Sequence, residues 1–155
     1  MQYKQYRLKF YLNLRHYIYI NGKKGQLHPH TWELCLNVLK TVDEFILFHQ
    51  MEEEMNAFLQ TYQDQILNEI EPFHRINPTL ENCCDYMAEQ LGKILNKLGY
   101  ILLMVEISET PAKSYVISYL NHDASREEQM MDIYTDTILK EIKKRNKIHK
   151  NMEKV

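Results

Sequence analysis

Two alternating segments joined by an Asn-Gly pair constrain this chain more than any other feature. From Tyr6 to Ile20, every second residue is apolar or histidine. A second segment, at about residues 27–40, alternates in the same way. A period of two is typical of a strand with one buried face, and Asn21-Gly22 is a common turn between antiparallel strands. The sequence therefore predicts an antiparallel hairpin at the start of the chain.

The remaining elements follow from the spacing of apolar residues and from turn and cap residues. They are a helix at about 48–66, a loop at 68–77, a helix that Asn77-Pro78-Thr79 opens and that ends near Gly99, strands at 100–110 and 114–120, and a helix through residues 131–142. This order predicts an α+β fold: a four-stranded antiparallel sheet with helices packed on one face, plus a C-terminal helix. We expect one domain, with its main part at residues 1–122 and a helical extension at 123–155.

Composition excludes several classes of function. The formal net charge of the 155 residues is −2, which argues against a nucleic-acid partner. No apolar run is long enough to cross a membrane, and the first residues do not resemble a signal peptide. Cys35, Cys83 and Cys84 are odd in number and two are adjacent, so they indicate packing residues rather than a disulfide framework. We expect a cytoplasmic protein.

Three histidines are the best candidates for chemistry. His28 and His30 are two residues apart in a predicted strand, so their imidazoles project from one face. His16 is in phase with the apolar face of the preceding strand, and the hairpin would bring all three together. Three imidazoles leave a fourth tetrahedral position open on zinc, as in catalytic sites, although imidazole also suits iron, nickel or copper. The alternative is three separate core histidines that are each hydrogen-bonded.

Four motifs resemble the family of 6-pyruvoyl-tetrahydropterin synthases and the related 6-carboxy-tetrahydropterin synthases. They are Leu-His-Pro-His-Thr-Trp at 27–32, Leu-Asn-Glu-Ile at 67–70, Asn-Pro-Thr-Leu-Glu-Asn at 77–82 and Val-Glu-Ile-Ser-Glu-Thr at 105–110. They occur in the family's order and with nearly its spacing, over about residues 10–120. The resemblance implies a tunnelling-type fold that assembles as a trimer or as paired trimers. It also implies zinc held by His16, His28 and His30.

The resemblance further implies a pterin site. Glu109 would receive the amino-pyrimidine edge of a pterin, and Thr79 would make a further contact. A carboxylate suits that edge because it accepts two N–H bonds at once. Without the family, Glu109 reads as a solvated residue at the end of a strand.

The usual catalytic groups of the family are replaced. Lys24 stands in place of its cysteine, and Gln63-Asp64 stands in place of its Asp-His pair. In the family these groups move protons while zinc polarises substrate oxygens, and triphosphate is eliminated from 7,8-dihydroneopterin triphosphate. Lys24 and Asp64 remain as candidate catalytic residues. Pro29 replaces the glycine between the zinc histidines, so we expect its strand to be an edge or to be unpaired at that point.

Three hypotheses about function follow. The first is a protein that binds zinc and a pterin and is a divergent or weakly active member of the family. The second is an active zinc-dependent lyase on 7,8-dihydroneopterin triphosphate that uses other acid-base groups. The third is a structural oligomer with an empty site.

Overall fold

The computed structural model describes residues 4–41, 48–120, 133, 135–136 and 138–140. They belong to two compact units, one at Lys4–Tyr119 and one that contains the described residues from Leu120 onward. In the second unit, the described residues from position 133 to 140 are helical, as predicted, and the rest of the predicted 131–142 helix lies outside the described residues. The predicted boundary at residue 122 stays a prediction.

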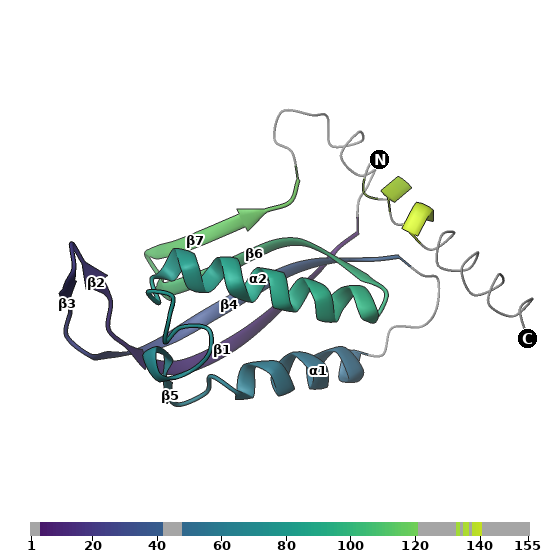
Figure 1. Ribbon diagram of the computed structural model, residues 1–155. Helices are drawn as coiled ribbons and strands as arrows, with labels where there is room; N and C mark the ends of the chain where they lie inside the picture. The colour runs from purple at the N-terminus through teal and green to yellow at the C-terminus, as the bar shows by residue number, and fades with distance from the viewer. Residues whose placement is uncertain (1–3, 42–47, 121–132, 134, 137, 141–155) are drawn as a thin grey trace, which may run out of the picture. The chain divides into compact units, whose positions relative to one another are not determined.

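A mixed sheet forms the centre of the first unit (Figure 1). Its strand order is β5-β1-β4-β6-β7, with β1 at Tyr6–His16, β4 at His28–Lys40, β5 at Gln65–Ile66, β6 at Tyr100–Thr110 and β7 at Lys113–Ser118. The four long strands are antiparallel, as predicted, whereas β5 pairs parallel with β1. The α+β fold is therefore confirmed, but the sheet has five strands rather than four. A two-residue strand is too short for any periodic signal.

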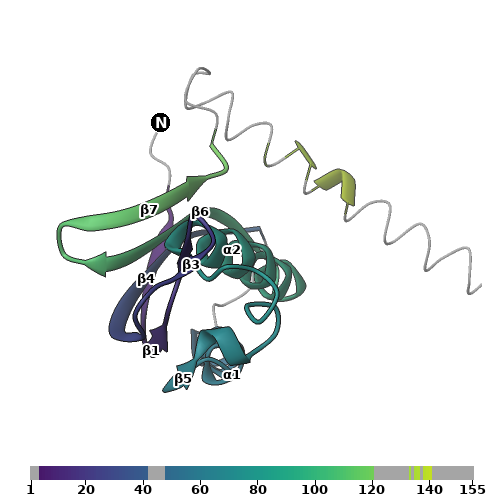
Figure 2. The same cartoon turned by 60° about the vertical axis from the view of Figure 1, so that its left-hand side comes forward.

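Helices cover one face of this sheet (Figure 2). They are α1 at Phe48–Gln60 and α2 at Leu80–Lys97, and a short helical turn, η1, spans Leu67–Glu69. Met51, Met55, Leu91 and Leu95 from the helices pack with inward strand residues such as Leu12, Trp32, Leu34 and Ile107. The predicted helix at 48–66 is too long, because a turn follows Gln60 and Ile66 belongs to β5. Within the described part of the chain, no helix combines the length and the apolar character that a membrane span requires.

The first predicted strand is also too long. β1 ends at His16, and a separate small hairpin follows, with β2 at Tyr19–Ile20 and β3 at Lys23–Lys24. Asn21 and Gly22 form its turn with φ values of 49° and 75°, which suits an Asn-Gly turn. Both β2 residues are exposed, so the alternation continues after the buried face has ended. The long strands β1 and β4 still pair as the sequence predicts, with this small hairpin between them.

Pro29 lies on a stretch of β4 that pairs with β1 but, among the described strands, has no partner on the other side. β6 pairs with β4 from Glu33 to Lys40, and Pro29 is outside that span. The missing N–H of proline therefore removes no bond to β6. Pro29 is therefore at an edge position, one of the two predicted alternatives: Arg15 of β1 lies opposite it on one side, and β6 does not pair with it on the other.

Candidate metal centre

The register of β1 and β4 brings the three histidines together. His16 is directly opposite His28, and His30 is the next residue along β4 on the same face. The ring centroids lie 4.6 Å apart for His16–His28, 4.7 Å for His28–His30 and 5.0 Å for His16–His30. Each ring offers a nitrogen within 4.8 Å of the other two. The convergence predicted from strand phase is thus present, above the buried indole of Trp32, which lies 5.5 Å from the His16 ring.

Two main-chain carbonyls fix which nitrogen carries the proton. His16 Nδ1 lies 2.8 Å from the carbonyl oxygen of Pro78, and His28 Nδ1 lies 2.8 Å from that of Gln26. A carbonyl can only accept, so each Nδ1 must donate its proton. Burial lowers the pKa of His16, which keeps its ring neutral near pH 7. A neutral imidazole with its proton on Nδ1 carries a lone pair on Nε2.

These lone pairs fit a bound cation. The Nε2 atoms of His16 and His28 face each other at 3.1 Å. Two ligands on a tetrahedral zinc, each about 2.05 Å from the metal, lie about 3.3 Å apart. Nε2 of His30 is buried and has no hydrogen-bond partner among the described residues, and burial lowers the pKa of this ring as well. Carbonyl-oriented histidines with converging free nitrogens are the usual donor set of a zinc site.

Glu109 lies beside this cluster at the end of β6. Its Oε1 is 3.7 Å from His30 Nε2, and its Oε2 accepts a hydrogen bond from Lys113 Nζ at 2.8 Å. Burial raises the pKa of the Glu109 carboxyl, but the hydrogen bond and charge of Lys113, together with the rings of His30 and His16, hold that pKa below its usual value. Glu109 is therefore an ionised acceptor of N–H bonds at neutral pH, not the solvated strand end that the sequence allowed.

Thr79 has a structural task in addition to any role in binding. It is the N-cap of α2, where its hydroxyl accepts from Asn82 N at 3.2 Å. The preceding residue, Pro78, supplies the carbonyl that binds His16. The sequence predicts Pro78 at an early position of the helix. In the structure it directly precedes the N-cap Thr79 and so lies outside α2.

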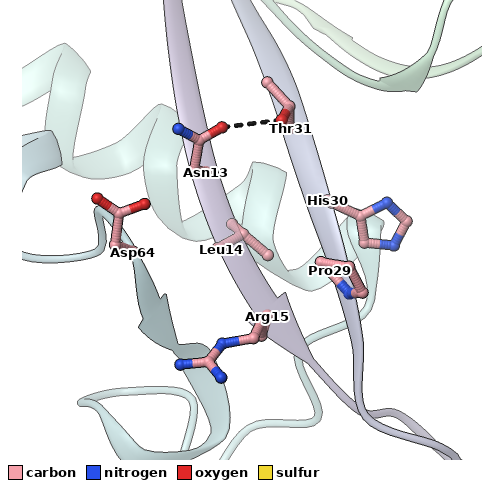
Figure 3. Close-up of a pocket in the computed structure, with 7 residues that line it drawn as sticks. All are labelled: Asn13, Leu14, Arg15, Pro29, His30, Thr31 and Asp64. Atoms are coloured by element: carbon pink, nitrogen blue, oxygen red, sulfur yellow. Dashed lines mark hydrogen bonds between the residues drawn. The ribbon is translucent and has the colours of Figure 1, made fainter.

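Lys24 and Asp64 lie in different surroundings. Lys24 is exposed on β3, and its Nζ is 4.1 Å from the ring centroid of Tyr17, a cation–π contact. Asp64 precedes β5, and its main-chain N donates to the Asn13 carbonyl at 2.7 Å. Asp64 borders a cavity of about 510 Å³ that is also lined by Asn13, Leu14, Arg15, Pro29, His30 and Thr31 (Figure 3). In that view the His30 ring points away from Asp64.

Several functional contacts could not be read from the sequence. The carbonyls of Gln26 and Pro78 belong to residues that carry no side-chain signal for this task. Lys113 bonds to Glu109 across the β6–β7 turn, but its partner in the ladder is Thr110 and the register shifts at Glu109, so recognising the hairpin does not predict this contact. The contact between His16 and the Pro78 carbonyl could be found only from the fold, because the two residues are 62 positions apart along the chain.

The cysteines are buried, as the sequence predicts for packing residues. Burial raises the pKa of Cys84 to about 12 and also raises the pKa of Cys83 and Cys35. A raised pKa keeps the protonated thiol as the dominant form below that pH, and the thiolate is the reactive form. We expect no reaction of the native protein with a disulfide reagent from pH 7 to 9. All three thiols should react after unfolding in guanidinium, and rapid labelling of the native chain would contradict this assignment.

The fold and the site together define a class: an α+β protein of the tunnelling type with three converging histidines beside a carboxylate. Residues 5–119 match the family model of 6-pyruvoyl tetrahydropterin synthase, so the chain belongs to that family. Solved structures agree in fold. The Caenorhabditis elegans 6-pyruvoyl tetrahydropterin synthase is 20% identical, with a TM-score of 0.58 over 74% of this chain and 94% of that one.

Two Plasmodium structures are similar as well. A catalytic-residue mutant of the Plasmodium vivax 6-pyruvoyltetrahydropterin synthase is 15% identical, with a TM-score of 0.55 over 74% of this chain and 97% of that one. The Plasmodium falciparum synthase is 16% identical, with a TM-score of 0.53 over 73% and 96%. At these identities the likeness concerns the fold. No curated protein sequence matches this chain significantly.

Proposed function

We propose that this chain binds one zinc ion and a pterin and is a divergent or weakly active member of its family. The observation that carries the proposal is the convergence of three histidines next to the ionised Glu109, 3.7 Å from His30. Zinc at these histidines would polarise substrate oxygens as a Lewis acid. Glu109 would accept two N–H bonds from the amino-pyrimidine edge, and Lys113 would move aside, since its side chain is 68% exposed.

The surroundings of the replaced residues support weak activity. Positioned acid-base groups typically contribute about 10²–10⁴ in rate. The carboxamide of Gln63 does not transfer protons, and its Oε1 accepts from Asn13 N at 3.2 Å. The ammonium of Lys24 rests on Tyr17. Asp64 is the remaining candidate base for the alternative of an active lyase: it lines the same cavity as His30, but the His30 ring points away from it (Figure 3).

We also propose a homo-oligomer, a trimer or paired trimers, in the cytoplasm. β5 covers residues 14–15 of β1, and the preceding residues of β1 have no partner on that side among the described strands. β7 pairs with β6 and has no second neighbour in the described sheet. Open edges attract further strands, and pairing between subunits would cover both.

The zinc-loaded protein is incubated with 7,8-dihydroneopterin triphosphate, next to the C. elegans synthase, and released triphosphate and pterin products are quantified. We expect measurable binding of the substrate with slow conversion. Lys24 stands at the position of the family's cysteine and Gln63-Asp64 at that of its Asp-His pair, so the chain has neither group there. Conversion at the rate of the C. elegans enzyme would favour the alternative. In that case Asp64→Asn should lower the rate, while the matched change at the exposed helix position Asp85→Asn should not.

A further inference from the structure

Two asparagines outside the histidine cluster hold the chain that follows His16. Tyr17 N donates to Asn68 Oδ1 at 2.9 Å, and Asn68 Nδ2 donates to the Tyr17 carbonyl at 2.9 Å. Asn77 makes the same two bonds to the main chain of Tyr19, again at 2.9 Å each. Each carboxamide therefore pairs with one residue of the chain as a neighbouring strand would.

These pairs continue an edge contact that β5 begins. β5 pairs with residues 14–15 of β1, and the two carboxamides take the next alternate positions along the same chain. His16 lies inside this run, between the backbone pairing and the first carboxamide. The chain is thus held on both sides of His16, where β1 ends and the small hairpin begins.

Asn77 links this run to the start of α2. Its carbonyl accepts from Thr79 N at 2.8 Å and from Asn82 Nδ2 at 2.9 Å. The next residue, Pro78, provides the carbonyl that accepts the Nδ1 proton of His16. One short segment therefore holds both the backbone after His16 and the atom that fixes its tautomer.

We propose that Asn68 and Asn77 are positioning residues of the candidate zinc site. They hold the main chain around His16 and the Pro78 carbonyl in place, so that His16 Nδ1 donates its proton to that carbonyl. The lone pair on His16 Nε2 then remains available to a metal ion. An asparagine is required because its carboxamide both donates and accepts, like the peptide group that it replaces. An aspartate of the same shape would place an acceptor against the main-chain carbonyl. The effect on zinc rests on the proposed function, whereas the effect on the tautomer does not.

The first test uses the full chain without metal. Asn68→Asp and Asn77→Asp are compared with Asn56→Asp, the same chemical change at an exposed position of α1. Nitrogen-edited NMR of the imidazole rings reports which nitrogen of His16 carries the proton. We expect the Nδ1–H form in the wild type and the control, and mixed tautomers in both variants. Wild-type tautomers in both variants would overturn the proposal.

The second test measures zinc affinity by competition with a chelator and, in parallel, the thermal unfolding of the metal-free protein. We expect each variant to lose about tenfold or more in affinity, as is usual when an outer partner of a zinc ligand is removed. Reduced stability with wild-type affinity would show a purely structural role and would also overturn the proposal. If the wild type itself binds no zinc, the proposed function fails, and the tautomer comparison still decides on positioning.

Discussion

Replacing His28 by alanine is expected to remove the bound zinc. The chain should carry about one zinc ion after dialysis against a weak chelator, and His28→Ala should carry almost none. Two remaining imidazoles cannot supply the three protein ligands of a site of this kind. His28 is the best position for the test because it is half-buried at the start of β4 and its Nδ1 contacts the nearby Gln26 carbonyl. His16 is 2% exposed and belongs to the core, so its loss would also affect folding.

The matched control is His49→Ala. The His49 side chain is 84% exposed on α1, where its Nε2 lies 3.0 Å from Glu53. This variant should retain zinc. Metal content is measured by atomic absorption, with circular dichroism to verify the fold. Full zinc content in His28→Ala would show that the three histidines are not the metal site.

Glu109→Gln is expected to abolish pterin binding. Glutamine keeps the length of the side chain but loses the charge and turns one acceptor into a donor, which would face the N–H groups of the pyrimidine edge. Two charge-assisted hydrogen bonds contribute about 3 kcal/mol or more, so affinity should fall at least about 100-fold. The fold should persist, because the ion pair with Lys113 is largely exposed on the lysine side and contributes little. Quenching of dihydroneopterin fluorescence measures the binding.

Glu106→Gln provides the control on the same strand. Glu106 lies opposite Cys35 on β4 and Val116 on β7, away from the histidine cluster in the ladder. Its variant should bind dihydroneopterin as the wild type does. Equal binding by Glu109→Gln would remove the pterin anchor from the proposal but would leave the metal site to be judged by His28→Ala.

Strand phase was enough to predict the core of the candidate site. Alternation places His16, His28 and His30 on the face that also carries the buried Trp32, and antiparallel pairing then forces convergence. The same reasoning could not find the end of β1, because exposed Tyr19 and Ile20 continue the alternation without a buried face. Apolar spacing alone does not show where a core stops.

Contacts between distant segments were beyond the reach of local patterns. β5 is two residues long, and its pairing with β1 depends on where α1 ends. Asn68 and Asn77 stood out in the sequence as parts of motifs, yet their bonds to Tyr17 and Tyr19 join positions more than 50 residues apart. Such pairings depend on tertiary packing, which a single sequence does not show.

The start of β4, which β6 does not pair with, has a consequence for self-association. An unpaired strand edge is a template for adding a strand from another molecule, and proline is one of the residues with which proteins prevent this. Pro29 lies on that stretch, between the two histidines and beyond the last pair with β6. Because proline has no N–H to donate, Pro29 opposes the addition of a strand from another molecule beside the histidine cluster.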